Sequence, residues 1–162
     1  VYAMAGASAN HIDITGNIFY LLYSALQNRP CSVSQSDMRV KAITQNYFYP
    51  DVTVACDKRE FVEDDPVAIL LNPIVIVEVL PPSTESHDRS TKFFEYQQIP
   101  SLQDYLLVAQ DTTRLELFSR GENKVWLHSM VNVLAESLLI PSIDVALALS
   151  DVYTSVTFDK TP

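Results

Sequence analysis

The most constraining feature of this 162-residue chain is the apolar segment at residues 74–80, which reads Ile-Val-Ile-Val-Glu-Val-Leu. If it is extended, alternate side chains point to opposite faces, and both faces are apolar except at Glu78. A strand of this kind is typical of the centre of a sheet that is covered on both sides. The segment therefore predicts a central strand with a carboxylate inside the protein.

The flanking patterns predict a mixed α/β fold. Apolar residues recur at three- and four-residue steps between positions 14 and 26, as in a helix with one buried face. Ser8 or Asn10 can cap its start, and residues 28–30 end it. The other predicted elements are strands over 31–43, 47–56 and 102–110, a turn over 81–84, a helix over 86–98 with Phe93 and Tyr96 facing inward, a hairpin of 114–120 with 124–128, and a helix from Ser150. Pro50 predicts a bulge, an edge or a strand entrance.

Composition limits the class of protein. Hydrophobic residues make up 48% of the chain and charged residues 19%, which excludes disorder and predicts one domain over residues 1–162. The net charge of −9 argues against a broad cationic coat for nucleic acid, although it leaves room for a local basic patch. No apolar run is long enough to span a bilayer. We therefore expect a soluble cytoplasmic protein, and because it begins at Val1 without an initiator methionine, we expect upstream residues.

The two cysteines, Cys31 and Cys56, lie in strand-like segments without a paired spacing. We interpret them as small buried hydrophobic residues of a protein from a reducing compartment. The three histidines are scattered and give no zinc pattern, and no serine or cysteine nucleophile motif is present.

Two carboxylates stand out. An unpaired Glu78 inside a doubly covered strand would cost several kcal/mol, so it needs a partner or a proton. It can form a buried salt bridge to one of the few arginines, lie at a strand end that reaches solvent, or bind a metal. Asp51 follows Pro50 and, alone, is an ordinary strand-entry residue. If the two strands are neighbours, facing Cβ atoms lie about 4.5–5.5 Å apart, and both carboxylates can bind one hard cation.

These residues belong to an ordered set of blocks that runs through the chain. The blocks are Tyr49-Pro50-Asp51-Val52, Val77-Glu78-Val79-Leu80-Pro81-Pro82-Ser83-Thr84, Asp88-Arg89, Lys92, Tyr96 and Ile99-Pro100-Ser101-Leu102-Gln103-Asp104-Tyr105. From about Ala3 to Val156, the chain resembles the Uma-two family of restriction-endonuclease-like proteins, which belongs to the PD-(D/E)XK nuclease superfamily. The resemblance implies an αβββαβ core with a mixed central sheet flanked by helices. It also implies Mg²⁺- or Mn²⁺-dependent hydrolysis of DNA phosphodiester bonds, with Asp51, Glu78 and the carbonyl of Val79 as metal ligands.

The chain departs from the superfamily pattern at Leu80, where a lysine usually stands two residues after the second acid. In this family Lys92 can be interpreted as the migrated lysine, which would orient water or stabilise phosphate charge. The alternative is an ordinary exposed helix lysine, solvated or paired with Glu95. Leu80 also favours a second function, that of a catalytically inactive nuclease-fold scaffold that binds a partner. A third is an enzyme acting on another phosphate-containing substrate.

Three further predictions concern weaker candidates and assembly. His11, at a helix start, can contact a phosphate or a neighbouring loop, and Asp88 suits the positive end of the next helix. His128 lies in the hairpin and carries no specific role. Because the net charge leaves little cationic surface on one subunit, we expect a two-fold homodimer. The dimer interface would be the strand edge at residues 47–50 or the hairpin at 114–128.

Overall fold

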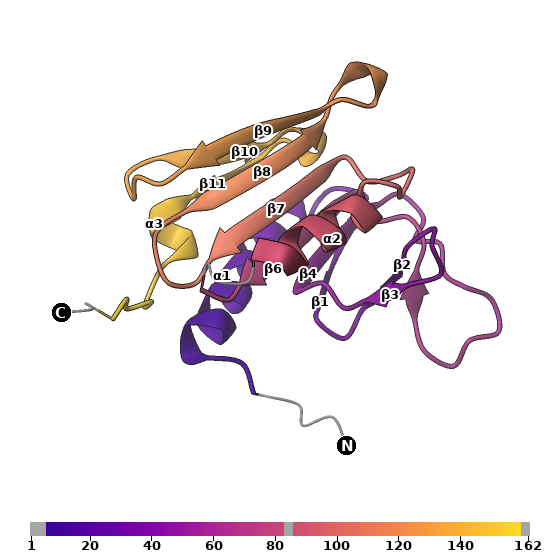
Figure 1. The fold of residues 1–162 in the computed structure, drawn as a ribbon, viewed down its shortest axis with the longest axis horizontal. Helices are drawn as coiled ribbons and strands as arrows, with labels where there is room; N and C mark the ends of the chain where they lie inside the picture. The colour runs from indigo at the N-terminus through magenta and orange to yellow at the C-terminus, as the bar shows by residue number, and fades with distance from the viewer. Residues whose placement is uncertain (1–5, 83–85, 160–162) are drawn as a thin grey trace.

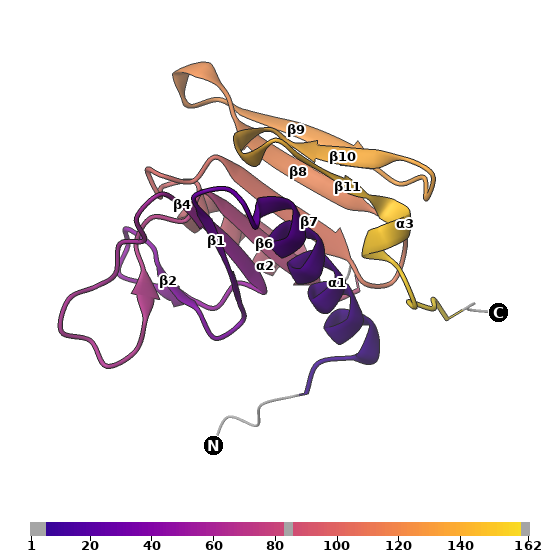
Figure 2. The same ribbon diagram turned by 180° about the vertical axis from the view of Figure 1, so that it is seen from behind.

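The structure is a computed structural model that describes residues 6–82 and 86–159, the side chains of residues 86–88 excepted. A six-stranded mixed sheet, in the order β1-β4-β6-β7-β8-β9, forms its centre. Helix α2 crosses one face of this sheet and α1 crosses the opposite face (Figures 1 and 2). The bounds are α1 Ala9–Leu26, β1 Cys31–Gln35, β4 Val52–Cys56, β6 Val75–Leu80, α2 Ser86–Tyr96, β7 Asp104–Ala109, β8 Leu115–Arg120 and β9 Trp126–Val131. The predicted fold class, a mixed sheet flanked by helices with an added hairpin, is confirmed.

Strand β6 lies inside the sheet, as its sequence predicts. It pairs antiparallel with β4 and parallel with β7, and it is buried from Val75 to Val79. The valines face the cluster that contains the buried side of α1, whereas Ile76 faces a second cluster with Tyr96 and Tyr105. Helix α2 is the crossover that the parallel β6–β7 pair requires. Residues 83–85, part of the predicted turn before it, lie outside the described residues.

Two segments predicted as single strands are each divided. The first contains β1 and the short β2 (Arg39–Lys41), and the second contains β3 (Tyr47–Phe48) and β4. Pro50 lies between β3 and β4, at a strand entrance, because proline cannot donate to the ladder. Strands β2 and β3 form a separate three-stranded sheet with β5 (Ile69–Leu70), so residues 47–50 are not an edge of the main sheet.

The sequence patterns missed one hairpin. Strands β10 (Ser137–Ile140) and β11 (Val145–Ala148) pair with each other and pack on the α1 side of the sheet through Leu138, Ile140 and Leu147. Leu139 is apolar but exposed, which hides the alternation that marks a half-buried strand. The final helix, α3 (Leu149–Val152), begins one residue before the predicted Ser150 and has only four residues.

The expectation of free cysteines was wrong. Cys31 and Cys56 stand opposite each other in the antiparallel β1–β4 pair, and their sulfur atoms form a disulfide. Twenty-five positions separate them in sequence, so only the pairing of the two strands brings them together. The cysteines therefore no longer support a reducing compartment. Among the described residues, no helix has the length and apolar character needed to cross a membrane.

Candidate active site

Asp51 and Glu78 lie on neighbouring strands at one level of the sheet. Val52 pairs with Val77, so one further step of the same register places Asp51 opposite Glu78. Alternation puts Glu78 on the face of Ile76, which is the face that α2 covers. Both residues are buried, with exposed fractions of 9% for Asp51 and 5% for Glu78. The predicted neighbourhood of the two carboxylates is therefore present.

Two side chains of α2 bind the carboxylate of Glu78. The hydroxyl of Tyr96 donates to Oε1 at 2.7 Å, and Nζ of Lys92 lies 3.3 Å from Oε2. Lys92 and Tyr96 are four residues apart, which places them on the same side of a helix. The Lys92 side chain is 38% exposed, so its ammonium reaches solvent and the buried acid together.

The alternative partner for Lys92 is excluded by the contacts of Glu95. That carboxylate faces the other way and accepts hydrogen bonds from Thr44 and Asn46. Glu78 is accordingly in a salt bridge, but with a lysine of the following helix rather than with an arginine. Strand β6 has leucine rather than lysine at position 80, and the ammonium group beside Glu78 comes instead from Lys92 on α2.

The electrostatics of Glu78 are those of a crowded, buried acid. Burial raises its pKa, the charge of Lys92 and the hydrogen bond from Tyr96 lower it, and the nearby charge of Asp51 raises it again. The pKa of Glu78 remains above its ordinary value. The negative form of this group is therefore under-compensated by the protein, and an added cation would stabilise it.

Asp51 is held by groups from two other elements. Its Oδ2 accepts a hydrogen bond of 2.7 Å from the backbone N–H of Val79, and its Oδ1 lies 3.0 Å from Nε2 of His11. His11 is in the first turn of α1, whose N-cap is Ser8. The hydrogen bond to Asp51 raises the pKa of His11, against the opposing effect of burial, and the charges of Asp51 and Glu78 add to the rise. Of the two roles expected for His11, the structure shows a contact with a neighbouring segment.

A pocket opens beside these groups. It is lined by Glu78, Val79, Leu80, Pro81, Pro82, Arg89, Lys92 and Tyr105. The hydroxyl of Tyr105 is buried and has no hydrogen-bond partner among the described residues. Burial and the charge of Glu78 raise the pKa of Tyr105, so the hydroxyl stays protonated and can donate. The pocket thus offers an acid and two cations to a polar ligand.

Sequence reasoning assigned no chemistry to Tyr96 or Tyr105. Tyr96 was predicted as an inward-facing core residue, which it is, but its hydroxyl also binds Glu78. For Tyr105 a signal existed, because it lies two residues before Leu107, the β7 partner of Glu78, and so shares its face.

The side chain of Asp88 lies outside the part of the chain whose side chains the structure describes. Among the side chains of residues 6–82 and 89–159, no three from His, Cys, Asp or Glu gather as a metal site, and His128 contacts Glu116.

Comparison with known proteins identifies the family. Residues 1–150 match the family Uma2, which is described as "Putative restriction endonuclease". The chain belongs to the Uma2 family. Two relatives come from Synechocystis sp. (strain ATCC 27184 / PCC 6803 / Kazusa). Protein slr1290 is 36% identical over 160 residues, which cover 98% of this chain and 82% of that protein. Protein sll1609 is 38% identical over 128 residues, which cover 78% and 72%.

A solved structure shows the same fold as this Uma2 chain. It is the crystal structure described as "a putative nuclease belonging to DUF820" from Anabaena variabilis ATCC 29413. The TM-score is 0.76 at 15% sequence identity, and the match covers 94% of this chain and 85% of that one. The Uma2 fold therefore extends over nearly the whole chain, and family membership indicates a nuclease-like protein.

Proposed function

We propose that this Uma2 protein is a divalent-metal-dependent DNA endonuclease of the PD-(D/E)XK type. The observation that carries the proposal is the buried pair of Asp51 and Glu78 at one level of the sheet, with Lys92 bound to Glu78. Acids on adjacent central strands can hold a divalent metal ion, and a cation beside them can stabilise charge on a phosphate, so together they can support phosphodiester hydrolysis. Family membership supports DNA as the substrate.

The donor groups fit Mg²⁺ or Mn²⁺. Carboxylate oxygens are preferred ligands of both hard cations, and the raised pKa of Glu78 reflects a negative charge that the protein leaves under-compensated. Asp51 and Glu78 would hold the ion, with the carbonyl oxygen of Val79 as a third protein ligand. When bound, such an ion polarises a phosphate and makes its bound water more acidic.

Lys92 would perform the task of the superfamily lysine from a different element. Its ammonium is 3.3 Å from Glu78 and lines the pocket, so it can orient the attacking water or stabilise charge on the phosphate. Tyr96 holds the other oxygen of Glu78 and thereby orients the carboxylate.

Cleavage of supercoiled plasmid DNA with Mg²⁺, Mn²⁺ or EDTA tests the proposal. The wild type should cleave only with metal, and Asp51→Asn and Glu78→Gln should be inactive. Lys92→Ala should abolish cleavage but keep the rise in melting temperature that Mn²⁺ causes, since binding to the folded state alone stabilises it. Lys58→Ala removes the same charge at an exposed position outside the candidate site and outside the proposed dimer edge, and it should cleave like the wild type.

Two results would contradict the proposal. A melting temperature that millimolar Mg²⁺ and Mn²⁺ leave unchanged would remove the metal site. No cleavage of any DNA with metal binding confirmed would favour the inactive scaffold, for which Leu80 is the specific sign. Leu80→Lys combined with Lys92→Ala is expected to restore part of the activity, because it returns an ammonium to the face of Glu78.

We also propose that the protein acts as a two-fold homodimer. Strand β9 is an outer strand of the six-stranded sheet, so the 114–128 hairpin carries an edge that can pair with a second copy. Light scattering at micromolar concentration should give twice the mass of the chain, and a monomer mass would exclude the dimer.

A further inference from the structure

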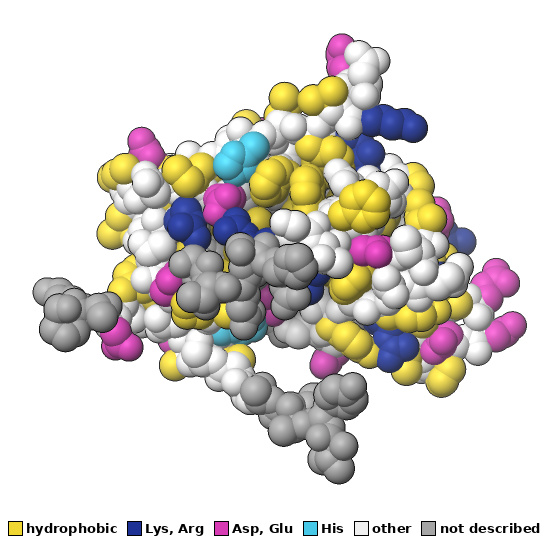
Figure 3. Space-filling view, in the orientation of Figure 1, with side chains coloured by type: hydrophobic (Ala, Val, Ile, Leu, Met, Phe, Trp, Pro, Cys, Tyr) yellow, Lys and Arg dark blue, Asp and Glu magenta, His cyan; other side chains and the backbone are white. Residues whose placement is uncertain are grey.

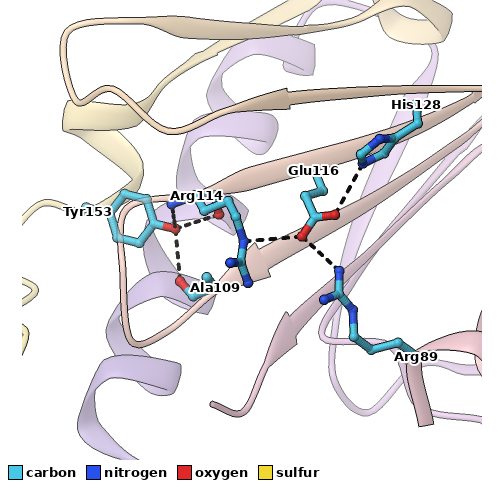
Figure 4. A network of polar contacts seen from close by, with 6 residues as sticks. All are labelled: Arg89, Ala109, Arg114, Glu116, His128 and Tyr153. Atoms are coloured by element: carbon cyan, nitrogen blue, oxygen red, sulfur yellow. Dashed lines mark hydrogen bonds and ion pairs between the residues drawn. The ribbon is translucent and has the colours of Figure 1, made fainter. Parts of the chain in front are cut away.

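A second group of charged side chains lies on the α2 face beside the candidate active site. Figure 3 shows cationic side chains gathered there around a carboxylate, with a histidine next to it. At its centre the carboxylate of Glu116, on β8, is 2.8 Å from Nη2 of Arg89 and 3.2 Å from Nε of Arg114, and Nε2 of His128 lies 3.2 Å from its second oxygen (Figure 4). We call Arg89, Arg114, Glu116 and His128 the Glu116 network.

The register of the sheet fixes the distance of this network from the active site. Glu78 pairs with Leu107 on β7, and Leu107 pairs with Glu116 on β8. Residues paired in this way point to the same face, and strands lie about 4.8 Å apart, so the two acids are separated by roughly 10 Å. Arg89 bridges the interval, because it lines the pocket of Glu78 and also binds Glu116.

The network carries net positive charge in a protein whose net charge is −9. Two guanidinium groups face one carboxylate, and Lys92 stands next to them at the pocket. Three of the eleven lysines and arginines, namely Arg89, Lys92 and Arg114, therefore gather on one face. Burial opposes the charge of Glu116, yet the hydrogen bond and charge of Arg89, the contact with His128 and the charge of Arg114 hold its pKa below the ordinary value. Glu116 thus stays ionised and keeps the two arginines oriented side by side.

The backbone that carries Arg114 is fixed from the C-terminal part of the chain. The hydroxyl of Tyr153 accepts a hydrogen bond from the N–H of Arg114 at 3.0 Å and lies 2.9 Å from the carbonyl oxygens of Ala109 and Arg114 (Figure 4). These contacts join the end of β7 to the start of β8. The Arg114 side chain is 27% exposed, although its Nε atom, which faces Glu116, is buried, so a fixed backbone holds a side chain that solvent partly reaches.

We infer that Arg89 and Arg114 form a binding site for a backbone phosphate of the DNA substrate, outside the phosphodiester bond that is cleaved. Guanidinium groups match phosphate oxygens in geometry and charge, and Glu116 holds them in place until the strand arrives. A strand whose scissile phosphate lies at Glu78 would pass over Arg89 toward Arg114. The inference rests on the proposed function for the identity of the substrate.

Binding of a fluorescein-labelled 20-base-pair duplex, measured by anisotropy in EDTA, tests the inference without cleavage. The logarithm of the association constant should fall linearly with the logarithm of KCl concentration, with a slope of about −0.9 for each phosphate contact. Arg114→Ala and Arg89→Ala should each weaken binding and reduce the slope by about one. Arg59→Ala, which removes a cation that stacks on Phe61, is the matched control and should leave the slope unchanged.

A second measurement separates this site from the reaction centre. Hydrolysis of bis(p-nitrophenyl) phosphate with Mn²⁺ uses a diester that has no neighbouring phosphate. Arg114→Ala should raise KM for DNA and leave the hydrolysis of this small diester unchanged.

Three results would overturn the inference: no binding of DNA by the wild type in EDTA, an unchanged salt slope in both arginine variants, or equal losses on DNA and on the small diester. A changed slope in a protein that never cleaves would refute the proposed function and leave the phosphate site standing.

Discussion

Replacing Tyr153 by phenylalanine should destabilise the protein by about 2 kcal/mol, because one buried hydroxyl serves three backbone groups. The ring stays, so packing is preserved. The partly buried N–H of Arg114 loses its acceptor and the carbonyl of Ala109 loses a buried donor, which together cost about 2 kcal/mol, while the carbonyl of Arg114 keeps its bond from the N–H of Ala109. Burial raises the pKa of Tyr153 to about 12, so the hydroxyl is protonated throughout the range of an ordinary stability experiment.

The assay is thermal unfolding followed by circular dichroism at pH 7. The unfolding entropy of a chain of this length is about 0.34 kcal/mol/K, so a loss of 2 kcal/mol should lower Tm by about 6 °C. Tyr20→Phe is the control, since the Tyr20 side chain is 68% exposed, and its Tm should match the wild type. A Tyr153→Phe protein that melts within 1 °C of the wild type would refute this account of how Arg114 is held.

Three more predictions concern the site and the disulfide. Because the pKa of Glu78 is raised in the folded state, its stabilising contribution is present below its ordinary pKa and is lost as pH rises. Glu78→Gln should therefore raise Tm of the metal-free protein at pH 7 and not at pH 4; a lower Tm at pH 7 would contradict the electrostatic argument. Tyr105→Phe removes a buried hydroxyl without a partner among the described residues, so Tm should not fall. A Tm lowered by several degrees would show that the hydroxyl is hydrogen-bonded. Cys31→Ser with Cys56→Ser opens a loop of 25 residues, and urea unfolding should show a loss of about 3 kcal/mol. Two free thiols in the denatured, unreduced protein would exclude the disulfide.

The central strand could be predicted because it depends on a short-range pattern, and the pair of acids could be predicted because the chain resembles a known family. Alternation at residues 74–80 identifies a doubly covered strand, and the order of the blocks around Asp51 and Glu78 identifies the family. The same kind of pattern failed for β10 and β11, where exposed Leu139 looks like a core residue. The apolar character of a segment does not by itself show which of its two apolar faces the fold will bury.

The contacts that complete the site depend on how distant elements pack. Nothing in the sequence around Tyr96 indicates that its hydroxyl will meet Glu78, because the contact depends on where α2 crosses the sheet. The pairing of Cys31 with Cys56 likewise follows from the antiparallel alignment of β1 and β4. The Glu116 network joins β8, the residue before it and β9 to α2, and the spacing of its four members in the sequence does not indicate that they meet.

The route by which an ammonium reaches Glu78 has a consequence for recognising such proteins. Lys92 comes fourteen positions after the acid and from the crossover helix, so the acid–lysine pair belongs to the β6–α2 unit and not to a tripeptide on one strand. A search that demands a lysine two residues after the acid discards this chain at Leu80. A search that asks for an acid in a central strand and a lysine two turns into the next helix would retain this chain. Such a search would separate chains that have lost the lysine from chains in which the next helix carries it.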